Sequence, residues 1–174
     1  EGVKLLEKGA NNNFSFCNIL LATLHSNPPP YLYNNTEIDY VKAFNLYRSL
    51  VFADKSKFVV KRVAYTIRQL CGLLLKGYVK FNPDFEVYGD PGENGVILGD
   101  KITLNLDQNT LKMAKYFLTN YAEGVNDTAT LNYYRAIVAY FYDRDYTAAR
   151  QYLDLEKDTY FKTIFLHYVF NEET

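Results

Sequence analysis

The stretch from Leu131 to Val169 constrains the fold of this chain more than any other part of the sequence. Two amphipathic helical patterns in it flank a four-residue polar break, Asp143-Arg144-Asp145-Tyr146, and a third pattern follows directly. Apolar residues that recur every three or four positions are typical of helices with one buried face. The stretch therefore predicts a helical hairpin followed by the start of another helix.

Five further helices are predicted on the N-terminal side of this stretch, from periodicity and from residues that start or stop helices. They span approximately residues 1–9, 14–25, 40–53, 56–76 and 107–121. The run Asn27-Pro28-Pro29-Pro30 ends the second helix, because proline lacks an amide donor and restricts the backbone before it. A short polyproline ligand for a partner's aromatic groove is the alternative interpretation of this run.

Apolar stripes along these helices predict which residues form the core. The stripes consist of Tyr40, Phe44, Tyr47 and Val51, then Val60, Val63, Ile67, Leu70 and Leu74, and finally Leu111, Ala114, Phe117 and Leu118. On another face of the longest helix, Lys57, Lys61 and Arg68 fall together. A solvated basic flank and a contact for an anionic partner are both compatible with these three cations.

Residues 82–107 interrupt the helical periodicity. Phe85-Glu86-Val87 and Ile102-Thr103-Leu104-Asn105-Leu106 alternate with period two, and the segment between them is rich in turn formers, Asp90-Pro91-Gly92-Glu93-Asn94-Gly95. This pattern predicts a β-hairpin or a structured loop inserted among helices.

Composition limits the class of protein. The 174 residues fit one helical domain, residues 1–174, and the first residue is not methionine, so we expect the domain to be part of a longer chain. The formal net charge of −1 opposes a nucleic-acid-binding role, which requires uncompensated cations. No apolar run approaches the roughly 18 residues that a membrane span requires, and a cytoplasmic location is expected.

Catalytic and metal-binding patterns are weak throughout the chain. The two cysteines, Cys17 and Cys71, lie in apolar helical patterns, and neither has a ligand-like spacing to His25 or His167. A pairing of Cys71 with His167 across the fold stays open. The acidic turn at 90–101 lacks two of the carboxylates that a calcium loop needs.

Two pairs of acidic residues could form catalytic carboxylate pairs, Asp84 with Glu86 and Asp143 with Asp145. Exposed acids at solvated edges are the usual explanation for pairs of this kind. We therefore predict no catalytic residue, no metal site and no cofactor, and the protein is expected not to be an enzyme.

The segment at about 131–160 resembles one degenerate unit of the tetratricopeptide repeat. The residues that carry the resemblance are Tyr146 after the turn, Tyr133 and Tyr140 in the first helix, and Ala149 and Leu153 in the second. The small side chain of Ala149 allows the two helix backbones to approach closely. Three residues depart from the family pattern. The family prefers a small residue where this chain has Ile137, alanine where it has Glu156, and often has proline where it has Phe161.

The resemblance implies a function as well as a fold. We expect residues 128–174 to form the repeat-like hairpin and the start of a following helix, within either a right-handed helical-hairpin array or an irregular helical bundle. The inner face holds no cation or amide of the kind that clamps a partner's terminal carboxylate. The predicted contact residues for an apolar or aromatic peptide are therefore Tyr134, Phe141 and Tyr142.

The predicted function is a non-catalytic scaffold for protein–protein interaction, with a protein or peptide partner. Helical repeats bury their faces by stacking and present a groove, so binding is the usual function of this class. The alternative is a helical accessory or regulatory domain of a larger enzyme whose chemistry lies elsewhere.

Overall fold

The protein is mostly α-helical, as the sequence predicts. The computed structural model describes residues 1–12, 15–27, 38–52, 60–81, 84, 86–89, 97–98, 101–102, 107–121 and 131–171. The α-helices are α1 (Gly2–Asn11), α2 (Ser15–Ser26), α3 (Tyr40–Phe52), α4 (Val60–Leu75), α5 (Gln108–Tyr121), α6 (Leu131–Val138), α7 (Tyr146–Leu155) and α8 (Thr159–Tyr168). A π-helical segment, η3 (Ala139–Asp143), continues α6 directly.

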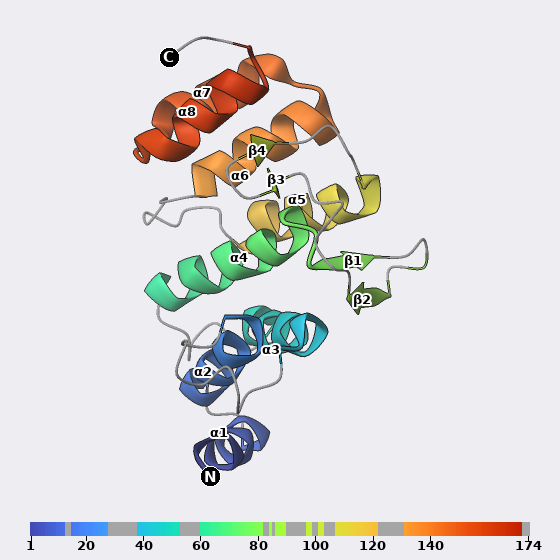
Figure 1. Ribbon diagram of the computed structural model, residues 1–174, viewed down its shortest axis with the longest axis vertical. Coiled ribbons are helices and arrows are strands. Elements are labelled where there is room, and N and C mark those ends of the chain that lie inside the picture. The colour runs from blue at the N-terminus through green and yellow to red at the C-terminus, as the bar shows by residue number, and fades with distance from the viewer. Residues whose placement is uncertain are drawn as a thin grey trace.

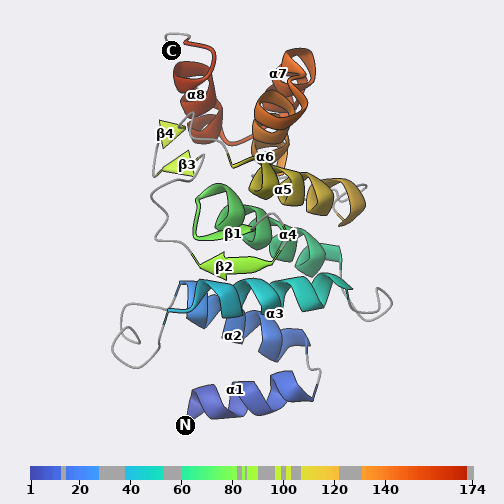
Figure 2. The same cartoon turned by 90° about the vertical axis from the view of Figure 1, so that its right-hand side faces the viewer.

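The helices form an elongated stack in the order of the chain (Figures 1 and 2). From α1 to α7, each helix packs mainly against the helices next to it in sequence, and α1 and α8 lie at opposite ends of the stack. Such a succession is how helical arrays bury their faces. The described helices do not show a tetratricopeptide repeat, and the resemblance of residues 131–160 to that family stays a prediction.

The interruption of the helices contains two short antiparallel strand pairs. β1 (Val79–Phe81) pairs with β2 (Val87–Gly89), and β3 (Ile97–Leu98) pairs with β4 (Lys101–Ile102). The predicted β-like insertion is present. A single hairpin would pair residues 85–87 with 102–106, whereas each observed strand pairs with a strand closer to it in the sequence. The turn at 90–95 and residues 103–106 lie outside the described part of the chain.

Most residues of the three predicted apolar stripes lie in the core, and the side chains of Val60 and Val63 lie outside the described part of the chain. All the predicted residues of α5 are buried, as are Phe44, Tyr47 and Val51 of α3, whereas Tyr40 is half-buried. Of the α4 stripe, Ile67, Leu70 and Leu74 are buried. Asp39 lies at the start of α3, where its carboxylate accepts a hydrogen bond from the Lys42 amide at 3.0 Å.

One cluster of aromatic rings joins the sheet to the helices. The Phe44 ring on α3 contacts Phe81 on β1 and Phe117 on α5 edge-on, with centroid distances of 5.7 and 6.1 Å. Edge-to-face contacts of this kind contribute about 1 kcal/mol beyond the area they bury. The cluster fixes β1 against α3 and α5, and the chain segment just before β1 is held near the start of α3.

Two buried tyrosines differ in how their hydroxyl groups are satisfied, and this difference gives a first prediction. The Tyr47 hydroxyl forms a hydrogen bond with the Thr23 hydroxyl, with 3.0 Å between the two oxygens. The Tyr133 hydroxyl has no hydrogen-bond partner within the described residues. We expect Tyr133→Phe to leave the free energy of unfolding unchanged or to raise it by up to about 1 kcal/mol, because it removes an unpaired buried polar group. The matched change Tyr47→Phe should lower it by about 1 kcal/mol. Urea unfolding of both variants measures the contrast, and a larger loss for Tyr133→Phe than for Tyr47→Phe would contradict it.

Candidate functional site

The residues predicted to contact a partner do not share one exposed surface. Tyr134 is 6% exposed and Phe141 is 1% exposed, so both belong to the core. Tyr142 is half-buried, and the Lys115 ammonium lies 5.4 Å from the centroid of its ring. In this conformation a partner has no access to Phe141, so the three predicted contact residues do not form one binding surface.

The hairpin nevertheless has the packing that the sequence indicates. Ala149 and Leu153 of α7 are fully buried, and Ile137 of α6 is buried as well. The Tyr146 ring, after the turn, lies 4.7 Å from the Tyr140 ring. The turn itself is closed by Asp145, whose carboxylate accepts the Ala148 amide hydrogen bond at 2.9 Å. Asp145 is therefore a helix cap, which explains it without a catalytic role.

Glu156 joins the starts of two helices. It is 6% exposed, and its Oε2 accepts a hydrogen bond from the Tyr133 amide near the start of α6 at 3.0 Å. Its Oε1 accepts a second hydrogen bond from the Asp158 amide, just before α8, also at 3.0 Å. Amide groups in the first turn of a helix have no partner within the helix, and the helix dipole favours an anion there. The carboxylate at the end of α7 therefore caps α6 from outside.

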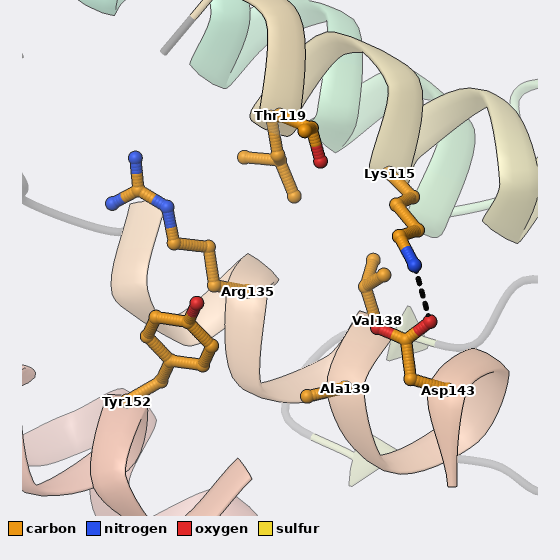
Figure 3. Close-up of a pocket in the computed structure, with 8 residues that line it drawn as sticks. Lys115, Thr119, Arg135, Val138, Ala139, Asp143 and Tyr152 are labelled. Carbon is orange, nitrogen blue, oxygen red and sulfur yellow. Dashed lines mark hydrogen bonds and ion pairs between the residues drawn. The ribbon is translucent and has the colours of Figure 1, made fainter. Parts of the chain in front are cut away.

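A cavity of about 410 Å³ lies between α5, α6, η3 and α7 (Figure 3). On one side of it, the Lys115 ammonium forms an ion pair with the Asp143 carboxylate at 2.5 Å, and Arg135 lies on the opposite side. Arg135 donates a hydrogen bond to the Asn132 side chain at 3.3 Å. Both cations thus interact within the chain. The ion pair ties α5 to η3, and it accounts for Asp143 as a structural residue.

A larger concavity of about 600 Å³, which we call the aromatic groove, lies where α2, α3, α4, α6 and α8 meet, next to the start of β1. Its aromatic lining consists of Tyr40, Tyr65, Tyr78, Tyr134 and Phe161. The other lining residues are Ser26, Asn27, Ile38, Arg68, Gln69, Gly72, Leu73 and Lys76. Its volume falls within the roughly 300–1,000 Å³ that is typical of sites for small molecules or short chain segments.

Ring contacts hold the walls of the aromatic groove in place. The Tyr40 and Tyr78 rings stack with centroids 4.4 Å apart, which joins the start of α3 to the chain just before β1. Phe161 of α8 stacks on the buried ring of Tyr133 at 4.7 Å. The Tyr65 hydroxyl lies 3.3 Å from the Thr23 hydroxyl. The aromatic side chains are therefore preorganised while part of their surface stays accessible.

The floor of the groove depends on a glycine. A Cβ atom at position 72 would lie 3.2 Å from the Tyr134 hydroxyl oxygen, so glycine allows this hydroxyl to approach the α4 backbone closely. Burial raises the pKa of the Tyr134 phenol above its ordinary value, Cys71 adds to this, and the Arg68 guanidinium acts in the opposite direction. Tyr134 is therefore neutral at physiological pH and contributes a hydroxyl rather than a charge.

Most residues of the aromatic groove were not predicted as binding residues. Tyr134 is the lining residue that the sequence predicts to contact a partner. Tyr40 is expected in the core stripe, Arg68 either on a solvated basic flank or at a contact for an anionic partner, and Phe161 only as a departure from the repeat pattern. The cations Lys57 and Lys61, predicted beside Arg68, lie outside the residues whose side chains are described. Tyr40 is the lining residue whose sequence position could have indicated a surface site. It is the first residue of its apolar stripe, and tyrosine is suited to half-buried positions.

The candidate metal ligands and nucleophiles that the sequence offers lie apart from one another in the described part of the chain. No group of three or more His, Cys, Asp or Glu side chains among them is arranged to hold a metal ion. Burial raises the pKa of the Cys71 thiol, which opposes formation of the nucleophilic thiolate. His167 is exposed on α8, and its ring contacts Tyr168. Asp84 and Glu86 are both exposed.

The fold and the groove together define a mostly α-helical stack with an accessible aromatic-lined concavity. No protein-family model, curated protein or solved structure matches this chain. None of the helices in the described ranges is long and apolar enough to cross a membrane. The arrangement of the side chains is therefore the basis for proposing a function.

Proposed function

We propose that this protein is a non-catalytic interaction scaffold that binds an apolar or aromatic segment of a partner protein in the aromatic groove. The observation that carries the proposal is the convergence of five aromatic side chains from α3, α4, α6, α8 and the chain just before β1 on one concavity. Tyrosine and phenylalanine are the residue types that dominate contact energies at protein interfaces.

The proposal moves the binding surface away from the inner face of the 131–169 hairpin. That hairpin still contributes to it, because Tyr134 of α6 lies in the floor and Phe161 of α8 lies in the wall. Stacked helical pairs commonly present concave surfaces to partners, which supports the assignment by analogy of architecture. The groove is short, so a linear segment of a partner fits it better than a broad domain surface.

The first functional prediction concerns Tyr78. Selection of displayed random peptides on the immobilised chain should enrich sequences with aromatic or large apolar residues. Tyr78→Ala should weaken binding of the enriched peptides by about tenfold or more, because it removes one wall of the groove and the ring that holds Tyr40. Fluorescence anisotropy with a labelled enriched peptide measures this change.

Tyr168→Ala is the matched control, because Tyr168 is an exposed tyrosine on α8 that does not line the groove. Both variants should keep a cooperative thermal transition. Gln69→Trp, which places a large side chain in the groove without removing a ring, provides a second test of occlusion. The proposal fails if no peptide family is enriched, or if the enriched peptides bind the Tyr78→Ala and Gln69→Trp variants as well as the original chain.

A further inference from the structure

We propose that the partner segment recognised by the aromatic groove is acidic, with a carboxylate side chain beside its aromatic or apolar residue. This inference rests on the proposed function and specifies the chemistry of the partner. It follows from the charge of the groove, from the placement of its cations along α4 and from the character of the surrounding rings.

The charge of the groove differs in sign from that of the chain as a whole. Its lining contains two cations, Arg68 and Lys76, and no aspartate or glutamate among the described lining residues. The whole chain has a formal net charge of −1. Cations concentrated in a concavity with low-dielectric walls attract an anionic ligand more strongly than the same cations spread over an open surface. The groove is therefore complementary to a negatively charged segment.

The two cations lie on one side of α4. Arg68, Gly72 and Lys76 are four residues apart in turn, and the Lys76 amide still donates to the Gly72 carbonyl at 2.9 Å, which keeps Lys76 in helical register. Eight residues of helix separate Arg68 from Lys76 by about 12 Å along the axis. An extended peptide spans that distance in roughly four residues. Two acidic residues about four positions apart would therefore reach both cations.

The cations and the rings are interleaved. Tyr65 and Gln69 flank Arg68 on α4, and Tyr78, stacked on Tyr40, follows Lys76 by two residues. Arg68 also interacts within the chain, so a carboxylate of the partner would bind beside that interaction. A guanidinium suits a carboxylate because its planar fork donates two parallel hydrogen bonds. An apolar residue between two acids would then lie against the tyrosines.

A nucleic acid fits these observations less well than an acidic peptide. Affinity for a polyanion increases with the number of phosphates that lysine and arginine neutralise, and two cations in one short groove neutralise few. Among the described lining residues only Arg68 and Lys76 are cations, so these residues do not form a longer basic track. A short segment with one or two carboxylates matches the available charge.

The test uses the whole chain and the displayed-peptide selection described above. We expect the enriched peptides to carry Asp or Glu next to the aromatic or apolar residue. A synthetic labelled peptide of the enriched sequence should bind about tenfold or more weakly after each acid is replaced by its amide, Asn or Gln. Added salt should weaken binding of the acidic peptide more than that of the amide peptide.

Charge reversal on the protein gives the complementary measurement. The double variant Arg68→Glu with Lys76→Glu should lose the acidic peptide and gain affinity for the same peptide with Lys in place of its acids. Lys8→Glu is the control, because Lys8 is an exposed cation on α1 that does not line the groove. The thermal transition of each variant shows whether the chain still folds.

The outcomes separate this inference from the proposed function. If enriched peptides contain no acid, or if their amide forms bind equally well, the inference fails while peptide binding in the groove stands. If no peptide is enriched, both proposals fail. If a labelled oligothymidylate binds the chain more tightly than the acidic peptide and loses affinity in the double variant, the groove is a nucleic-acid site instead, and the inference fails.

Discussion

Glu156→Ala is expected to lower the free energy of unfolding by about 3 kcal/mol. The carboxylate accepts two backbone hydrogen bonds, from the amides of Tyr133 and Asp158, and hydrogen bonds to charged groups contribute about 1.5–3 kcal/mol each. Alanine leaves the Tyr133 amide without its acceptor in a buried position. For a chain of this length the loss corresponds to roughly 6–12 °C in the midpoint of thermal unfolding. Urea unfolding and a thermal scan measure the two quantities.

Two further substitutions test the reason given for this loss. Glu156→Gln keeps the shape of the side chain and one acceptor oxygen, so it should cost about half as much as alanine. Lys157→Ala changes an exposed neighbour and should alter stability by less than about 0.5 kcal/mol. An equal loss for glutamine and alanine would show that the charge, rather than the number of acceptors, carries the effect. A loss below about 1 kcal/mol for alanine would show that water replaces the carboxylate.

Glu156 also illustrates what the sequence could not indicate. Within the repeat-like pattern it is a departure, because the family prefers alanine at this position. Its role depends on a hydrogen bond to an amide 23 residues earlier in the chain, which exists only after α7 folds back on α6. Helical periodicity describes neighbours three and four positions apart and carries no information about such a distant contact.

The helices themselves follow from local patterns. The stripes that contain Phe44, Ile67 and Phe117 repeat with the period of an α-helix, and each lies in the core as predicted. Asp39 and Asp107 accept backbone hydrogen bonds at the starts of α3 and α5, and aspartate is a common residue type at such positions. These features need only residues within one or two turns of each other, which is why one sequence suffices to predict them.

The faces of α6 were harder to predict. Seven of its eight residues are buried, and the exception is the half-buried Arg135. Because nearly every residue of α6 is buried, polar Asn132 included, the pattern of apolar and polar residues does not separate an inner from an outer surface. The π-helical segment η3 then adds a residue to the turn and rotates the positions after it relative to an α-helix. The resemblance to the tetratricopeptide repeat predicts Tyr134 and Phe141 on a contact surface, whereas both are largely buried in the structure and only Tyr134 lines the aromatic groove.

The aromatic groove is not encoded in any single segment. Its two stacked tyrosines, Tyr40 and Tyr78, come from different elements, and Phe161 comes from the far end of the chain. Their convergence depends on the order in which the helices stack. Each tyrosine taken alone is compatible with a core position or an exposed seam. A binding site built at the junction of several helices therefore requires the three-dimensional arrangement.

Ala149→Leu is expected to lower the free energy of unfolding by about 2 kcal/mol, although it keeps an apolar residue with good helix propensity. Ala149 is 0% exposed on α7, which packs mainly against α6, so three additional carbon atoms have to displace neighbouring atoms. Overpacking of a dense core costs about 1–3 kcal/mol.

Ala148→Leu is the matched control for Ala149→Leu, because Ala148 is half-buried and the larger side chain can extend toward solvent. Its effect should stay within about 0.5 kcal/mol, and urea unfolding of both variants measures the difference. Ala149→Gly separates size from helix propensity, since it should cost about 1 kcal/mol without any steric conflict. If Ala149→Leu unfolds at the same urea concentration as Ala148→Leu, the close approach of α6 and α7 does not depend on a small residue. The physical basis of the repeat-like hairpin would then have to lie in its aromatic contacts, such as Tyr140 with Tyr146, instead.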